Sequence, residues 1–407
     1  MNDQETLANP STLPRSSRGS RVPETLSKEM KAWRRHLHSC PEFGFEEVST
    51  SAYVAGVLKA IDLDEIVEGV GGTGIVATLR RGDSPRTIAL RADMDALRIQ
   101  EQSALPYASR TPGLMHACGH DGHTAMLLGA ARLLASEPDF DGTVRFIFQP
   151  AEEWGQGAQA MLDDGLLQRF PFDEIYGLHN MPGLPVGRFE TRPGALMSAE
   201  DNFEITLTGK GGHAARPHWG NEVMVGACSL VTSLQTIVSR RLDPTDIAVV
   251  SVTEFLTDGT RNVLPGKARI LGDCRSFHSG TSALIEQQMR IIAQGVALAF
   301  NLEVEVDYSR VFVPLINNAE LVEEALCVAR EVCDPTEVRL AAEPMTASED
   351  FARFLEYVPG CFAFIGNGVE SPPLHNAEYD FNDSNLVLGA RYLAEMAKRR
   401  LAQTNRQ

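Results

Sequence analysis

Apolar positions recur at helical spacing near the start of the chain and then give way to short β-type runs. Residues 24–38 place apolar side chains on one helix face, whereas residues 75–80 and 87–91 are apolar and rich in β-branched residues. Residues 143–149 are apolar enough to predict a central strand. Together with the predicted helix 158–168 and strand 174–178, this alternation predicts an α/β layer. We expect a mixed sheet with helices on both faces and a site at the carboxyl ends of the strands.

The pattern changes at about Met197. Residues 203–208 alternate strictly between apolar and polar, and a helix, two strands, a helix and a strand are predicted after them, over residues 222–241, 247–255, 268–277, 282–300 and 302–308. The order βαββαβ predicts an inserted ferredoxin-like satellite domain of about one hundred residues. The α/β pattern then resumes with predicted elements over residues 319–332, 362–365 and 385–400.

The expected organisation has four segments. They are a disordered leader over residues 1–22, the first part of a catalytic domain over 23–196, the satellite domain over 197–310, and the second part of the catalytic domain over 311–407. The leader lacks the apolar stretch of a secretory signal, and its acidic residues Asp3 and Glu5 disfavour a transit peptide.

Composition narrows the class of protein. The net charge of −17 disfavours nucleic acid and anionic membrane surfaces as partners, although a local cationic site can still bind an anionic small molecule. No apolar run reaches the roughly 18 residues that a membrane span needs. The seven cysteines are scattered and odd in number, which fits reduced thiols. We therefore expect a cytoplasmic protein.

The densest chemistry lies in eight residues, His116-Ala-Cys118-Gly-His120-Asp-Gly-His123. Imidazole and thiolate are the side chains that hold transition metals best. The apolar run after the motif, residues 125–130, predicts a helix, so the motif would form a turn that enters a helix. The alternative is a set of unrelated histidines in a turn, which five potential ligands in so short a stretch make an inferior explanation.

Two adjacent carboxylates, Glu152 and Glu153, follow the predicted strand 143–149. One carboxylate can bind a metal while its neighbour moves protons, with a pKa raised by burial and by the adjacent charge. The alternative is a solvated acidic pair at a helix N-terminus, where negative charge is favourable. Their place directly after a buried strand disfavours that alternative and points to a metallohydrolase.

Further ligands must come from distant segments. His179 ends a predicted strand and His375 lies near the C-terminus, although either histidine alone could be an ordinary hydrogen-bonded residue. With Cys118, His120 and one glutamate they make five ligands. A catalytic zinc ion usually takes three protein ligands, so five suit two ions that share a water about 3.5–4 Å apart better than one ion.

Other polar residues have weaker signals. Asp93 and Asp95 follow a predicted strand, and either could bind metal or orient a ligand histidine; Asp95 is our candidate for the second role. In the satellite domain, glycines around His213 allow a loop that approaches a ligand closely or a simple turn. Asn262 and Arg275 lie in similar segments, where an arginine at a strand end can bind a carboxylate bidentately or pair on the surface.

These motifs together resemble the dinuclear metallo-amidohydrolase family of aminoacylases and glutamate carboxypeptidases. The branch most similar contains hippurate hydrolase and the plant auxin-conjugate hydrolases, and the resemblance runs from about Arg34 to Leu393. Its motifs, in chain order, are Arg35-His36-Leu37-His38, Leu90-Arg-Ala-Asp93-Met-Asp95-Ala-Leu97, Met115-His-Ala-Cys118-Gly-His120-Asp-Gly-His123, Gln149-Pro-Ala-Glu152-Glu153, Gly177-Leu-His179, Gly211-Gly212-His213 and Ser348-Glu349-Asp350-Phe351.

The resemblance implies roles for individual residues. It implies two divalent metal ions, a general base at Glu152, and metal ligands at Cys118, His120, Glu153, His179 and His375. It also implies that the satellite domain forms a homodimer or a larger homo-oligomer, and that His213 reaches the active site of the partner subunit to polarise the scissile carbonyl. Asn262 and Arg275 match positions that contact the carbonyl and the carboxylate of the substrate.

The expected reaction is hydrolysis of an N-acyl-L-amino acid, hippurate-like or N-acetylated, to a carboxylic acid and a free amino acid. A metallo-dipeptidase or carboxypeptidase that uses the same centre is the alternative. A metal-storing protein without catalysis is a third class, which the intact Glu152–Glu153 pair disfavours. The thiolate of Cys118 favours zinc or cobalt, while carboxylate and imidazole ligands also admit manganese or nickel.

Overall fold

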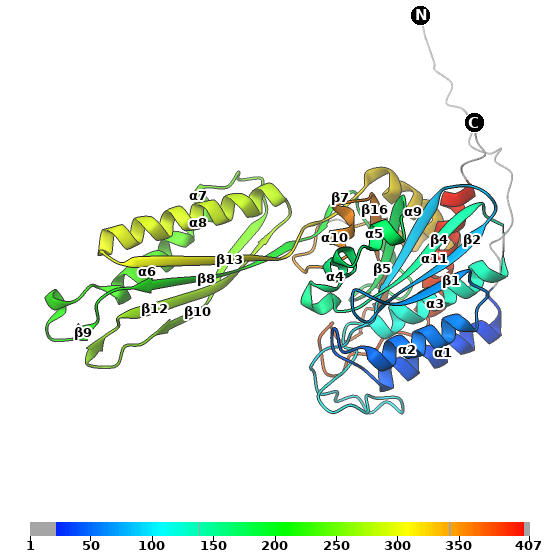
Figure 1. Cartoon of the computed structure of the whole chain (residues 1–407), viewed down its shortest axis with the longest axis horizontal. Coiled ribbons are helices and arrows are strands. Elements are labelled where there is room, and N and C mark those ends of the chain that lie inside the picture. Colours follow the sequence, from blue (N-terminus) through cyan, green and yellow to red (C-terminus); the bar gives the residue numbers. More distant parts are fainter. Residues whose placement is uncertain (1–21, 138, 342, 403–407) are drawn as a thin grey trace, which may run out of the picture.

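The computed structural model describes residues 22–137, 139–341 and 343–402, so the predicted leader lies outside the described residues except for Val22. The described chain contains two large sheets that lie apart from each other (Figure 1). One sheet has eight strands in the order β1-β2-β4-β3-β5-β16-β6-β15, and the other has four in the order β10-β12-β8-β13. The expected α/β architecture with a mixed sheet is confirmed.

The eight-stranded sheet places the parallel strands at its centre. Its strands are β1 Glu65–Val70, β2 Gly74–Arg81, β3 Thr87–Asp93, β4 Gly142–Gln149, β5 Glu174–Pro182, β6 Phe189–Thr191, β15 Val338–Leu340 and β16 Gly360–Gly368. β3 pairs in parallel with both β4 and β5, and β16 pairs in parallel with β5. The carboxyl ends of these central strands therefore meet at one edge of the sheet, which is where ligands bind in open α/β sheets.

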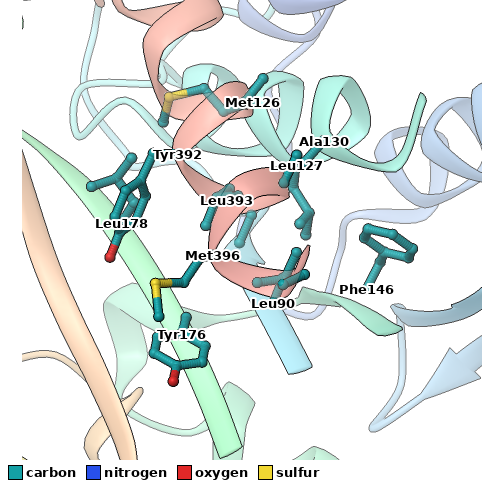
Figure 2. Packing of buried hydrophobic residues seen from close by; sticks show 14 of the residues in the cluster. Leu90, Met126, Leu127, Ala130, Phe146, Tyr176, Leu178, Tyr392, Leu393 and Met396 are labelled. Atoms are coloured by element: carbon teal, nitrogen blue, oxygen red, sulfur yellow. The ribbon is translucent and has the colours of Figure 1, made fainter. Parts of the chain in front are cut away.

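Helices cover both faces of this sheet. They are α1 Glu24–Ser39, α2 Val48–Lys59, α3 His120–Ser136, α4 Gly157–Asp163, α5 Leu166–Arg169, α9 Ala319–Val332, α10 Ala352–Leu355 and α11 Asn385–Ala402. Alternate strand residues belong to different cores: Phe146 packs with α3 and α11, whereas Ile147 packs with α4 and α5. Figure 2 shows the first core, in which Leu127 and Leu393 of the helices lie close to Leu90 of β3.

The structure refines several predicted elements. The helix expected over 158–168 is two short helices, because Gly165 adopts a left-handed φ of 80° between them. The helix expected over 222–241 is likewise divided into α6 Val223–Leu234 and α7 Thr236–Arg240. The hydrophobic pattern predicted neither α2 nor β1. Among the described residues, no helix combines the length and the apolar composition that crossing a membrane requires.

The second sheet has its own hydrophobic core. It consists of β8 Ala199–Thr208, β10 Ala248–Thr257, β12 Lys267–Ser276 and β13 Glu303–Phe312, covered by α6, α7 and α8 Ser279–Phe300. All neighbouring strands are antiparallel. Two small ribbons complete the described strands: β9 Gly212–His213 pairs with β11 Val263–Leu264, and β7 Gly194–Met197 pairs with β14 Leu315–Asn317. We call this part the satellite unit. Its assignment as a ferredoxin-like domain and the expected domain limits stay predictions.

Candidate metal centre and catalytic site

The candidate site lies at the carboxyl edge of the parallel strands. Asp93 is the last residue of β3, Glu152 and Glu153 follow β4 in a short 3₁₀ turn, and His179 lies near the end of β5. His375 comes from the loop that follows β16, where its backbone N–H donates to the carbonyl of Ala117. Segments far apart in the sequence therefore meet at one place because their strands are neighbours in the sheet.

Special backbone conformations hold the two motifs in place. Gly119, the N-cap of α3, has a φ of 94°, and a Cβ there would lie 2.3 Å from the Asn180 side chain. Ala151 adopts a left-handed φ of 49° directly before Glu152, and its N–H donates to the carboxylate of Glu47. The Gly119 turn starts α3 beside the sheet edge, and the Ala151 turn directs both carboxylates back toward it.

All five predicted ligands come together in two groups that share Cys118. Donor atoms within each group lie within 4.8 Å of one another, and the groups are Cys118 with His120 and His179, and Cys118 with Glu153 and His375. Sγ of Cys118 lies 3.4 Å from Nε2 of His179. Oε2 of Glu153 lies 3.3 Å from Nε2 of His375. The shared cysteine makes two adjacent cation sites a better description of the cluster than one.

The unpaired atoms in this cluster fit a cation. Nδ1 of His120 lies 3.0 Å from the carbonyl oxygen of Asp95, while its Nε2 is buried and has no hydrogen-bond partner. Oε1 of Glu153 is buried in the same way and lies 3.8 Å from that Nε2. Nδ1 of His179 bonds to the carbonyl of Asn180, which leaves its Nε2 directed at Cys118. Imidazoles held in this way by one nitrogen are typical of metal ligands.

The other two histidines of the motif have different surroundings. Nδ1 of His123 lies 2.7 Å from Oδ1 of Asp93, and its Nε2 accepts the backbone N–H of Asn180. Both nitrogens of His123 are therefore used. His116 is fully buried without a hydrogen-bond partner for either nitrogen, and burial lowers its pKa to about 4. It belongs to neither of the two groups that share Cys118. Of the three histidines in the motif, only His120 presents a free nitrogen to the other predicted ligands.

The electrostatics distinguish the two glutamates. Burial, together with the nearby carboxylates of Glu349 and Glu153, raises the pKa of Glu152 well above its usual value. Burial raises the pKa of Glu153, but the hydrogen bond with His375 and the charges of His120 and His375 together outweigh it and lower this pKa. Burial also raises the pKa of the Cys118 thiol. A bound cation would favour the thiolate at that position. The arrangement thus offers one carboxyl suited to proton transfer and one suited to binding a cation.

A buried ionic network that includes Glu349 and Asp350 lies close to Glu152, and it did not stand out in the sequence as a functional feature. Arg91 is almost fully buried and donates to four side chains, those of Gln149, Asp93, Glu349 and Asp350. These partners come from two adjacent strands and from the segment that precedes α10. An arginine within an otherwise apolar strand is the signal that could have identified this network, since buried charges are almost always paired.

A pocket of about 460 Å³ adjoins the cluster. Cys118, Glu152, Glu153, His179 and His375 all line it. Its apolar wall includes three methionines, two phenylalanines and a leucine, namely Met181, Met197, Met345, Phe312, Phe364 and Leu374. The polar side chains include Glu200, Arg275 and Ser348. The pocket can therefore hold a small molecule with an apolar part and a charged part beside the candidate metal site.

The satellite residues do not all reach this pocket. Arg275 lines it, whereas His213 and Asn262 lie around β9 and β11, at the end of the satellite unit that points away from the eight-stranded sheet (Figure 1). There, Nδ1 of His213 accepts the N–H of Ala215, and the carbonyl of Asn262 accepts the N–H of Ala214. A single chain thus keeps His213 and Asn262 apart from its own metal ligands, and their expected action in a partner subunit stays a prediction.

Comparison with known proteins agrees with this geometry. Residues 89–399 match the peptidase family M20/M25/M40. Hippurate hydrolase of Campylobacter jejuni is 40% identical over 92% of this chain and 98% of that protein. N-acetyl-L-cysteine deacetylase of Bacillus subtilis is also 40% identical, over 93% of this chain and 89% of that protein.

Comparison with solved structures also finds a protein of this family. A dinuclear metal binding peptidase of Bacillus subtilis, 32% identical, superimposes with a TM-score of 0.82 and covers 93% of this chain and 99% of its own. The family match spans most of the chain, and the relatives are similar over nearly their full length. This protein is therefore a hydrolase that belongs to the peptidase family M20/M25/M40.

Proposed function

We propose that this protein is a metal-dependent amidohydrolase that cleaves N-acyl-L-amino acids to a carboxylic acid and a free amino acid. The observation that carries the proposal is the pair of ligand groups sharing Cys118, beside the buried Glu152 and a pocket of matching size. The substrates named in hippurate hydrolase and N-acetyl-L-cysteine deacetylase, two relatives at 40% identity, support this substrate class.

Two divalent cations would be held by the five ligands. His120 and His179 would contribute imidazole nitrogens, Glu153 and His375 would serve the second ion, and Cys118 would contribute to both. When bound, such ions supply Lewis acidity, which lowers the pKa of water and stabilises negative charge on an amide oxygen. Zinc suits this thiolate and imidazole set best, with manganese, cobalt and nickel as alternatives.

The side chains of the protein perform the proton transfers. Glu152 accepts the proton of the attacking water, because burial and neighbouring carboxylates make its carboxyl a stronger base than an exposed glutamate. The same carboxyl then protonates the leaving amine nitrogen. Asp95 keeps His120 oriented through its contact with Nδ1. Arg275, which lines the same pocket, would bind the carboxylate of the substrate.

A homodimer in the cytoplasm completes the proposal. The edge strand β10 of the satellite unit exposes Val249, Phe255 and Leu256, and an exposed apolar edge strand is suited to pairing with a second copy. In such a dimer, His213 and Asn262 would act on the substrate of the partner subunit. The scattered, unpaired cysteines support a reducing compartment.

The test compares substrates and a variant. Metal-loaded protein is assayed with hippurate, N-acetyl amino acids and dipeptides, and its metal content is measured by elemental analysis. We expect turnover of the acylated amino acids and two ions per chain. Turnover of dipeptides alone would favour the metallo-dipeptidase or carboxypeptidase alternative.

Replacing Glu152 with Gln should retain both ions and lower kcat by about a thousandfold. Glu24→Gln, at an exposed helix end, is the control and should leave kcat unchanged. Normal turnover by the E152Q variant would contradict the role of Glu152.

A further inference from the structure

Arg275 is the positive side chain of the candidate pocket. Among the described residues that line the pocket, it is the only lysine or arginine. It comes from the end of β12 in the satellite unit, and its Nη1 donates to Oγ of Ser348 in the other unit. A substrate with a free carboxylate would therefore find its only guanidinium partner at this position.

This guanidinium is already engaged by two carboxylates. Nη2 of Arg275 lies 2.8 Å from Oε2 of Glu200, and Nε lies 2.9 Å from Oδ1 of Asp273. Nη1 donates to Ser348 at 2.9 Å. Two carboxylates thus face one guanidinium, and each of its three nitrogens already has a hydrogen-bond partner.

A substrate carboxylate would have to compete with these partners for Arg275. The three contacts use one N–H on each nitrogen, so an incoming carboxylate must share the five N–H groups of Arg275 with two carboxylates that already neutralise its charge. Glu200 lines the pocket, whereas Asp273 does not belong to the described residues that line it. Of the two carboxylates that hold Arg275, an incoming anion therefore meets that of Glu200, which repels it.

We propose that Glu200 is a specificity-determining residue that competes with the α-carboxylate of the substrate for the guanidinium of Arg275. The inference rests on the proposed function, because it takes an N-acyl amino acid as the substrate. In the free enzyme Glu200 holds Arg275, and in the complex it gives up Nη2 to the substrate. Glu200 thereby weakens the binding of carboxylate substrates relative to neutral ones. Burial and the nearby Asp273 raise the pKa of Glu200 despite Arg275, in accord with an excess of negative charge there.

The test uses two substrates with the same scissile bond, hippurate and its primary amide, which lacks the carboxylate. In Glu200→Gln the side chain still accepts a hydrogen bond from Nη2 but no longer carries charge. We expect KM for hippurate to fall by about fivefold to tenfold, while KM for the amide changes by less than about twofold. Where the amide is turned over too slowly, its inhibition constant against hippurate replaces KM.

Glu204→Gln is a matched control. Glu204 lies on the same strand and pairs with an arginine of the neighbouring strand, Arg269, at 2.6 Å, but it is not among the described residues that line the pocket. This variant should change neither KM. If E200Q does not fold, Glu200→Asp, which shortens the side chain, should shift KM for hippurate in the same direction by a smaller factor.

Two outcomes would overturn the inference. One is an E200Q variant with an unchanged or raised KM for hippurate, and the other is an equal change for hippurate and its amide. Failure of the proposed function is distinguishable, because the metal-loaded wild-type protein would then cleave neither compound.

Discussion

One carboxylate, that of Asp95, positions two of the proposed metal ligands. Its Oδ1 lies 3.1 Å from Nδ1 of His120, and its Oδ2 accepts the backbone N–H of Glu153 at 3.1 Å. His120 begins α3 and Glu153 follows β4, so the two contacts of Asp95 connect segments that are far apart in the sequence. Asp95 thus orients an imidazole and locates a carboxylate at the same time.

Replacing Asp95 with Ala should weaken metal binding by about tenfold to a hundredfold, because His120 loses the partner that fixes its ring. Competition with a chelator measures the dissociation constants. Asp62→Ala, at a fully exposed position, is the control and should bind metal like the wild type. Unchanged affinity in D95A would show that His120 needs no such support.

The sharing of Cys118 predicts the metal content of two variants. Cys118→Ala should lower the content to less than one ion per chain, because both groups lose a ligand. His375→Ala should keep about one ion, because His375 belongs to only one of these groups. Elemental analysis after dialysis distinguishes these results. Equal losses in the two variants would argue against a shared cysteine.

A buried ion pair near α3 predicts pH-dependent stability. Burial lowers the pKa of His38, but the hydrogen bond and charge of Asp121 and the contact with Glu101 outweigh it and raise the pKa to about 9. A folded-state pKa above the unfolded value stabilises the protein below about pH 6.5, and this contribution is lost as the pH rises through 9.

His38→Gln should therefore cost about 3 kcal/mol more at pH 6 than at pH 10, measured by urea unfolding. Replacement of the exposed His218 by Gln is the control. An equal cost at the two pH values would mean that His38 is neutral in the folded protein.

The turn that carries Glu152 depends on a glycine after it. A Cβ on Gly157 would lie 1.6 Å from the carbonyl oxygen of Pro150, which is backbone and cannot move aside. Gly157→Ala should destabilise the protein by about 3 kcal/mol and displace the catalytic turn, so that kcat falls as well.

The matched control is Gly56→Ala in α2, where a new Cβ meets nothing within 4 Å. It should stabilise the protein by up to about 1 kcal/mol through helix propensity. Thermal unfolding and steady-state kinetics measure both variants. A G157A variant with wild-type stability would show that the turn can adjust.

Much of the fold followed from local patterns. The strand that ends at Asp93, the strand before Glu152 and the strand that carries His179 were predictable, because residues buried on both sides of a parallel strand leave a continuous apolar run. Each difference between a predicted and an observed element has a physical cause. β1 is largely exposed and has little apolar patterning, and Gly165 interrupts a helix whose apolar spacing continues across it.

The residue types that can bind a metal were visible in the sequence, but the sequence did not show which histidines of the motif would face the other ligands. His116, His120 and His123 are equivalent in the motif, and their differences arise from partners on other elements. Nδ1 of His123 contacts Asp93 and its Nε2 accepts the N–H of Asn180, whereas Nδ1 of His120 contacts Asp95 and its Nε2 has no hydrogen-bond partner. Of these two rings, only His120 directs a free nitrogen at the predicted ligands.

The sequence by itself determined the chemistry and the order of the elements, because residue type and burial periodicity are local properties. Only the tertiary structure decided which side chains face one another. Arg91 with Glu349, and Arg275 with Glu200, are pairs whose members are separated by long stretches of chain. Such contacts depend on strand order, register and the packing of helices, which no local pattern encodes.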